Sequence, residues 1–160
     1  MKTMDDLFLH HLKDIYYAEK QILKALPKMV KATKSPELAE AFETHRQETE
    51  GQVQRLEQIF EILDKPARGV KCEAIEGLIA EAKEVMDEAK ESGVLDAGLL
   101  ASAQAVEHYD IARYGTMSAW ANQLGLSKAV KLLEQTLEQE KAADRLLTRL
   151  AESAVNAEAA

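Results

Sequence analysis

Cysteine, proline and glycine are all scarce in this chain of 160 residues, which contains one, three and seven of them respectively. The single cysteine, Cys72, excludes a disulfide bond within the chain and is typical of a reducing compartment, so we expect a cytoplasmic protein. Few glycines and prolines leave little sequence for turns. Because the alternation of apolar and polar residues that marks strands is also absent, the sequence predicts a small number of long helices.

Basic clusters and long apolar runs are missing as well. The formal net charge is −8, and no basic stripe offers a path for phosphates, so we expect no nucleic-acid partner. The longest apolar runs are far shorter than the roughly 20 residues that a membrane span needs. The segment MKTMDDLFLHHLKD places two acids ahead of its apolar residues, and we expect no signal peptide there. A membrane is therefore not an expected partner either.

Capping residues and apolar spacing place five helical segments along the chain. Thr3 and Asp6 form a pattern typical of a capping box, and Ser35 followed by Pro36 is typical of an N-cap and first helical residue. The predicted segments run from residue 3 to about 30, from 35 to about 63, from about 72 to 90, from about 96 to 124, and from 128 to the early 150s.

Three residues and the tail carry further expectations about helix ends. Pro27 should kink the first helix or end its regular part. Gly125 is a favourable C-cap, and Ser127 is the expected N-cap of the last helix. The tail at about 153–160 should fray.

These lengths predict an all-α fold with one domain covering residues 1–160. Four long helices bury a common core as a bundle, and short connections make the first two and the last two antiparallel hairpins. The short helix lies in the long crossover between the second and third long helices. One long crossover is typical of ferritin-like four-helix bundles.

Each long helix carries an apolar row that becomes polar near its midpoint. On the last helix, a count of three and four residues gives leucines at both ends, with Glu140 and Asp144 between them. The other rows place Glu19 on the first helix, His45 with the adjacent Glu48 on the second, and Glu107 with Asp110 on the third long helix. Because antiparallel helices of similar length align their midpoints, these groups should converge in one buried layer.

Several carboxylates in one dry layer repel one another, and multivalent cations are the natural remedy. Shared protons are the alternative, and each residue taken alone would more often be an ordinary core or edge residue. Carboxylates with one or two imidazoles suit Fe or Mn rather than Zn. We therefore expect two iron ions per chain, with Mn as a substitute, and seven candidate ligands: Glu19, His45, Glu48, Glu107, Asp110, Glu140 and Asp144.

Five motifs resemble those of the YciF-like, ferritin-like stress-response proteins of bacteria. They are YYAEKQILKALPKM, HRQETEGQVQRLEQIF, KCEAIEGLIAEA, VEHYDIARYGT and LEQTLEQEKAADRLL, in this order along nearly the whole chain. The resemblance implies a rubrerythrin- or ferritin-like bundle, a homodimer and a link to bacterial stress. Similarity to di-iron proteins implies Glu19, Glu48, Glu107 and Glu140 as ligands, with His45, Asp110 and Asp144 as supplementary ones. No Glu-x-x-His pair occurs on the second or last long helix, which departs from the usual pattern.

Two functions remain open from the sequence. The first is a di-iron protein that reacts with a small oxidant, dioxygen or peroxide, under stress. The second is a non-enzymatic stress protein whose polar layer is vestigial or protonated and which acts through contacts of its helix faces. Iron storage is a third option, although nothing in the sequence indicates a cage. Aromatic residues outside the rows, such as Tyr17 and Trp120, favour a homodimer that would cover them.

Overall fold

The chain folds as five α-helices followed by a π-helical turn and one short helix, in a computed structural model that describes residues 1–160. No strand is present, which confirms the all-α prediction. The elements are α1 (Met4–Ala32), α2 (Pro36–Ile62), α3 (Glu73–Glu88), α4 (Leu95–Gln123), α5 (Ser127–Leu150), η1 (Ala151–Val155) and α6 (Asn156–Ala159).

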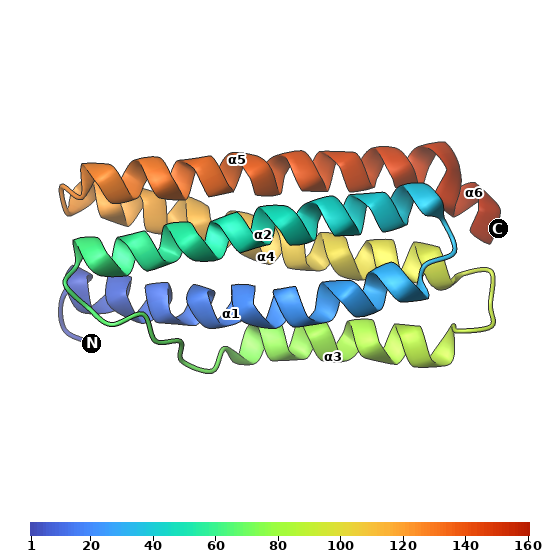
Figure 1. The fold of residues 1–160 in the computed structure, drawn as a ribbon, viewed down its shortest axis with the longest axis horizontal. Coiled ribbons are helices and arrows are strands. Elements are labelled where there is room, and N and C mark those ends of the chain that lie inside the picture. Colours follow the sequence, from blue (N-terminus) through green and yellow to red (C-terminus); the bar gives the residue numbers. More distant parts are fainter.

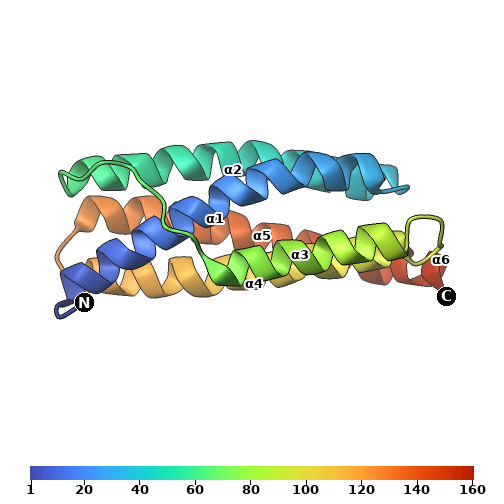
Figure 2. The ribbon, with the colours of Figure 1, turned by 90° about the horizontal axis from the view of Figure 1, so that it is seen from below.

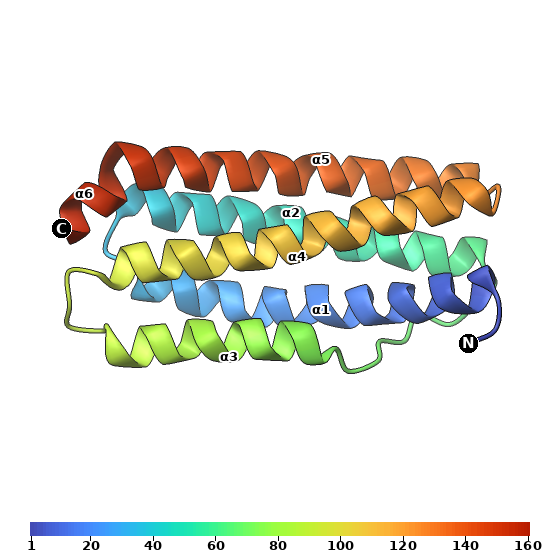
Figure 3. The ribbon, with the colours of Figure 1, turned by 180° about the vertical axis from the view of Figure 1, so that it is seen from behind.

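Four of the helices form a bundle in which every neighbouring pair is antiparallel (Figure 1). The pairs in contact around the bundle are α1 with α2, α2 with α5, α5 with α4, and α4 with α1. The fifth helix, α3, lies outside this square and packs against α1 and α4 (Figures 2 and 3). The linker and α3 together carry the chain from one end of the bundle to the other, which confirms the ferritin-like crossover.

The predicted helix starts are correct at two of three positions. Thr3 forms a capping box with Asp6, and Ser35 accepts a hydrogen bond from the Leu38 backbone N–H while Pro36 opens the helix. Ser127 is not an N-cap, because Leu126 occupies that position and no side chain caps α5. The turn before α5 instead depends on Gly125, whose φ of +70° lies in the left-handed region that glycine tolerates best.

Pro27 does not end α1, which continues to Ala32. A proline inside a helix removes one backbone hydrogen bond and costs about 3 kcal/mol. Leu26 and Met29 flank the proline and are both buried. Burial of these two side chains against the bundle offsets the local cost, so the helix persists.

The tail at about 153–160, which was predicted to fray, is helical as far as Ala159. The chain continues from α5 as η1 and then α6, and both contact α4. Ala151 and Val155 are buried and belong to the hydrophobic core. Their burial holds the start of the tail against the bundle end.

Two glycines allow the crossover to approach the bundle closely. A Cβ on Gly69 would lie 2.9 Å from the Cβ of Tyr17, and a Cβ on Gly98 would lie 2.5 Å from a methyl carbon of Val85. Next to Gly69, the Val70 backbone N–H donates to the Lys13 carbonyl of α1 at 3.1 Å. The linker is thus bonded to α1, and α3 lies tightly against α4.

The aromatic residues that favoured a dimer are partly satisfied within one chain. The Tyr17 hydroxyl donates to Glu76 of α3 at 2.6 Å, and Trp120 packs edge-on against His11 with ring centroids 5.1 Å apart. Both residues are half-buried. This argument for self-association is therefore weaker than the sequence indicates, and the homodimer stays a prediction. No helix combines the length and the hydropathy that crossing a bilayer requires.

Asp96 joins the two hairpins at one end of the bundle. Its carboxylate accepts hydrogen bonds from the Thr33 hydroxyl at 2.6 Å and from the backbone N–H groups of Lys34 and Ser35 at 2.9 and 2.8 Å. Asp96→Ala should lower the free energy of unfolding by about 2 kcal/mol, because these donors lose a charged acceptor. Urea denaturation tests this, with the exposed Glu91→Ala as a control of equal charge change. Equal stability of the two variants would contradict the assignment.

Candidate metal centre

A layer of polar side chains lies buried at the middle of the four-helix bundle. Helix α1 contributes Glu19, α2 contributes His45, Thr49 and Gln52, α4 contributes Glu107 and Asp110, and α5 contributes Glu140. All seven are buried, and three of the acids are fully inaccessible. These residues occupy the same inward rows as the leucines above and below them, so the periodicity that buries the leucines also buries the acids. Of the seven side chains predicted to converge, the structure brings five together: Glu19, His45, Glu107, Asp110 and Glu140.

Five of these side chains form two groups that share one residue. Ligand atoms of His45, Glu107 and Glu140 all lie within 4.8 Å of one another, and so do those of Glu19, Asp110 and Glu140. In the first group, Nε2 of His45 lies 3.4 Å from Oε1 of Glu107. Glu140 therefore belongs to both groups of donors.

Most polar atoms in the layer have no hydrogen-bond partner in the protein. Nine buried side-chain nitrogens and oxygens are unpaired, and they belong to Glu19, His45, Gln52, Glu107, Asp110 and Glu140. Leaving a buried polar group unpaired costs about 1–3 kcal/mol, and more if it is charged. The unpaired layer therefore lowers the stability of the fold by itself. A cation that accepts the lone pairs of these atoms would offset that cost.

Burial and mutual repulsion favour the neutral forms of the acids. Burial raises the pKa of Glu19 well above its usual value, and the charge of Glu140 raises it further. Burial also raises the pKa of Asp110, as do the charges of Glu19 and Glu140. For Glu107, burial again raises the pKa most, followed by its contact with Glu140. Without a cation, burial therefore favours protonation of Glu19, Glu107 and Asp110 through their raised pKa values.

Two further side chains, one from α4 and one from α2, moderate the charge of the layer. Tyr114 is fully buried one turn from Asp110, and its hydroxyl donates a hydrogen bond to Glu19. Arg55 of α2 donates through Nε to the Thr136 hydroxyl at 2.8 Å, and its charge opposes the rise in the pKa of Glu19. Burial lowers the pKa of Arg55 itself, whereas the neighbouring acids raise it. The apolar spacing of the sequence assigned neither residue to the layer, although a single cation one turn after Gln52 was a usable signal for Arg55.

Glu48 lies at the margin of the layer. Its side chain is half-buried, burial raises its pKa, and the nearby His45 lowers it. It belongs to neither of the two groups of close donors.

Asp144 does not join the layer, and the prediction that it faces the other acids is wrong. Its Oδ1 accepts a hydrogen bond from Gln104 at 3.1 Å and lies 3.2 Å from Nε2 of the exposed His108. The Asp144 side chain keeps 21% of its surface exposed. Asp144 therefore links α5 to the outer side of α4.

A difference in helical register explains the position of Asp144. The inward row of α5 passes through Thr136, which is buried, and Ala143, which lines an internal cavity, rather than through Leu137 and Asp144. Both rows share Glu140 and the residues seven positions from it, so spacing alone cannot choose between them. Because Leu137 is more apolar than Thr136, the sequence favoured the row through Leu137 and Asp144, which is not the inward one.

The donor set fits a pair of hard divalent cations. It contains four carboxylates and one imidazole and has no thiolate, a composition that suits Fe or Mn. Four carboxylates carry four negative charges, which is the charge that two divalent cations neutralise. The unpaired atoms of these same residues are the ones that ligation would satisfy.

The sequence of the chain is similar to a described protein family and to a protein of Escherichia coli. The profile of a family described as a domain of unknown function (DUF892) matches residues 3–160. Protein YciF of Escherichia coli (strain K12) is 49% identical over 160 residues, which cover 99% of this chain and 96% of YciF.

Solved structures show the same fold. The crystal structure of the E. coli stress protein YciF is 50% identical, with a TM-score of 0.93 over 98% of this chain and 99% of that one. YcfI from Rhodopseudomonas palustris, described as a candidate structural protein, is also 50% identical, with a TM-score of 0.88 over 92% and 94% of the two chains. A protein from Xanthomonas campestris is 22% identical with a TM-score of 0.73, a similarity of fold alone.

Proposed function

The chain belongs to the DUF892 family, whose profile matches residues 3–160. We propose that it is a di-iron protein that reacts with a small oxidant. The observation that carries the proposal is the sharing of Glu140 by two groups of buried donors. Carboxylate-bridged pairs of iron ions are typical of ferritin-like bundles. Manganese would suit the same donors.

Each group of donors would hold one ion. His45 and Glu107 would bind the first, Glu19 and Asp110 the second, and Glu140 would lie between them. Bound iron would supply the capacity to exchange electrons with the oxidant. Glu48, at the margin, would be available as a further ligand.

The surrounding residues would orient the ligands and balance their charge. The hydrogen bond from Tyr114 fixes one oxygen of Glu19, so the other oxygen is free for an ion. Arg55 adds a positive charge near the layer and is held by Thr136. Apolar rows above and below keep water out, and a dry site strengthens every charge interaction within it.

The similarity to the E. coli protein YciF supports a role in the stress physiology of bacteria. YciF is named a stress protein in E. coli, and its structure and this one agree closely. A metal centre that consumes an oxidant would be protective under such conditions. We therefore place the proposed reaction in the response to stress.

Anaerobic loading with ferrous iron tests the proposal. After desalting, elemental analysis should find about two iron ions per chain, and exposure to air or peroxide should convert them to ferric iron. Asp144→Asn is a matched control that should retain both ions, because Asp144 lies outside the layer. Protein that retains no iron, or iron that remains ferrous in both oxidants, would contradict this function.

The second candidate function is that of a non-enzymatic structural protein. The description of YcfI favours it, and so do the raised pKa values of Glu19, Glu107 and Asp110, which a protonated network would share. In that case the layer would remain metal-free in cells. Metal analysis of protein purified without added iron separates the two functions.

A further inference from the structure

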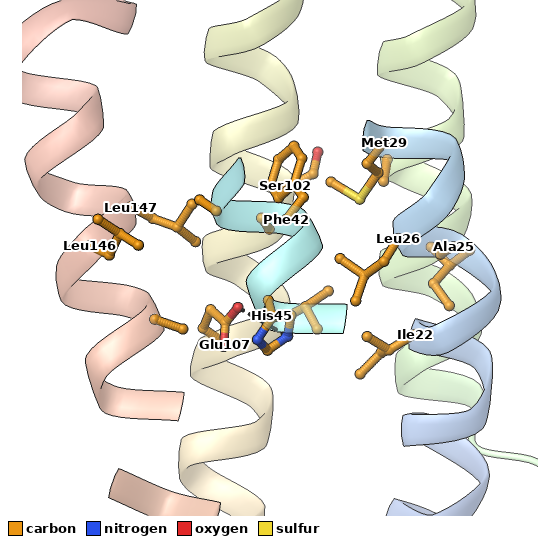
Figure 4. Close-up of a pocket in the computed structure, with 16 residues that line it drawn as sticks. Ile22, Ala25, Leu26, Met29, Phe42, His45, Ser102, Glu107, Leu146 and Leu147 are labelled. Atoms are coloured by element: carbon orange, nitrogen blue, oxygen red, sulfur yellow. Dashed lines mark ion pairs between the residues drawn. The ribbon is translucent and has the colours of Figure 1, made fainter. Parts of the chain in front are cut away.

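An internal cavity adjoins one end of the polar layer. Its volume is about 40 Å³, and 13 of its 16 lining residues are hydrophobic. Figure 4 shows Ile22, Leu26 and Leu147 around it, with His45 and Glu107 together at one end. The cavity therefore has apolar walls and one polar end, which belongs to the candidate metal centre.

The polar groups that line the cavity differ in what they offer a ligand. The Ser102 hydroxyl already donates to the Gly98 carbonyl at 2.9 Å. Nδ1 of His45 and Oε2 of Glu107 have no partner, and these two side chains are 6% and 2% exposed. The unpaired polar side-chain atoms that line the cavity thus lie at its end beside the polar layer.

Size and polarity together restrict what the cavity can hold. Its volume corresponds to roughly three water-sized spheres, whereas pockets for drug-sized ligands are about 300–1,000 Å³. Water in a cavity needs two to four polar partners, which only the His45–Glu107 end provides, so the apolar remainder of the cavity does not hold water. A charged ligand would be unpaired over most of its surface. A small uncharged apolar molecule fits these constraints.

We propose that this cavity binds dioxygen beside the His45–Glu107 end of the layer. The identification of dioxygen as the oxidant rests on the proposed function, whereas the binding itself is a property of the metal-free protein. Hydrogen peroxide is polar and would lose its hydrogen bonds to water on entering such walls. The cavity therefore favours dioxygen over peroxide.

The test uses dioxygen itself, which is paramagnetic, and metal-free protein with labelled Ile and Leu methyl groups. Under dioxygen pressure, relaxation of the methyl protons of Ile22, Leu26 and Leu147 should increase several-fold more than that of Ile59 and Leu133. These two reference residues are also buried, with 0% of their surface exposed against 3–4% for the cavity residues, but they do not line the cavity. Uniform relaxation across both sets would overturn the inference.

Filling the cavity provides the matched variants. Ala143→Leu on α5 and Ala82→Leu on α3 should each remove the enhancement, because both alanines line the cavity. The exposed Ala142→Leu should keep it. Two filled variants on different helices guard against loss of the fold in one of them. Enhancement that persists in a folded filled variant would overturn the proposal.

Failure of this inference and failure of the proposed function are distinguishable. The relaxation measurement contains no metal, so its result is independent of iron binding. In iron-loaded protein, Ala143→Leu should slow oxidation by dioxygen and leave oxidation by peroxide unchanged. Equal slowing with both oxidants would overturn the assignment of the cavity to dioxygen while leaving the iron site in place.

Discussion

Replacing Glu140 with alanine should remove both iron ions from the protein. Because Glu140 belongs to both groups of donors, its loss takes a ligand from each ion at once. We expect the affinity for each ion to fall by at least about 100-fold, since loss of even an outer-shell partner costs about 10–100-fold. Elemental analysis after desalting should show the iron content falling from about two per chain to nearly none.

Variants of the unshared ligands provide the contrast. His45→Ala and Asp110→Ala each affect one group only, so each should retain about one ion per chain. Circular dichroism should show that all three variants remain helical. Retention of both ions by Glu140→Ala would contradict the bridging position of this carboxylate.

Metal-free protein should become more stable as the pH falls from about 8 to 5. The folded-state pKa values of Glu19, Glu107 and Asp110 lie well above the ordinary values of 4.5 for glutamate and 3.8 for aspartate. Between the unfolded and the folded pKa, the native state binds more protons than the unfolded state. Stability is therefore complete below the unfolded pKa and is lost as the pH rises through the folded pKa, by up to about 1.4 kcal/mol per pH unit for each group.

Urea denaturation at a series of pH values measures this slope. Asp110→Asn and Glu19→Gln should each reduce it, because the neutral amide removes one titrating group. Acids outside the layer such as Glu43, whose hydrogen bond with Arg46 lowers its pKa, affect stability only below about pH 4.5 and leave the range from 8 to 5 unchanged. Iron should reverse the trend, since protons compete with the metal for the carboxylates. A metal-free protein that loses stability steadily from pH 8 to 5 would rule out the buried acids as described.

The sequence was sufficient to predict the layer on three of the four long helices. On α1, α2 and α4, large apolar residues flank the polar ones on both sides, so the inward row is unambiguous. On α5 two rows are possible, and both contain Glu140. The larger apolar side chain of Leu137 favoured its row, whereas the structure buries Thr136 of the other row. Rotation of a helix about its axis depends on its neighbours, and one helix considered alone does not specify it.

Contacts between helices were beyond reach of the sequence for the same reason. Hydrogen bonds from Tyr114 to Glu19 and from Arg55 to Thr136 join residues more than 80 positions apart. The shared position of Glu140 and the cavity next to His45 likewise depend on how four helices meet. Periodicity predicts which face is buried, whereas packing determines which atoms meet.

Diffraction from an iron-loaded crystal at the iron absorption edge would show whether the layer holds two metal ions. We expect two anomalous peaks about 3.5–4 Å apart, one beside His45 and Glu107 and one beside Glu19 and Asp110, with Glu140 next to both. Absence of any peak in the layer, or a single peak at the outer pair of Asp144 and His108, would contradict this expectation.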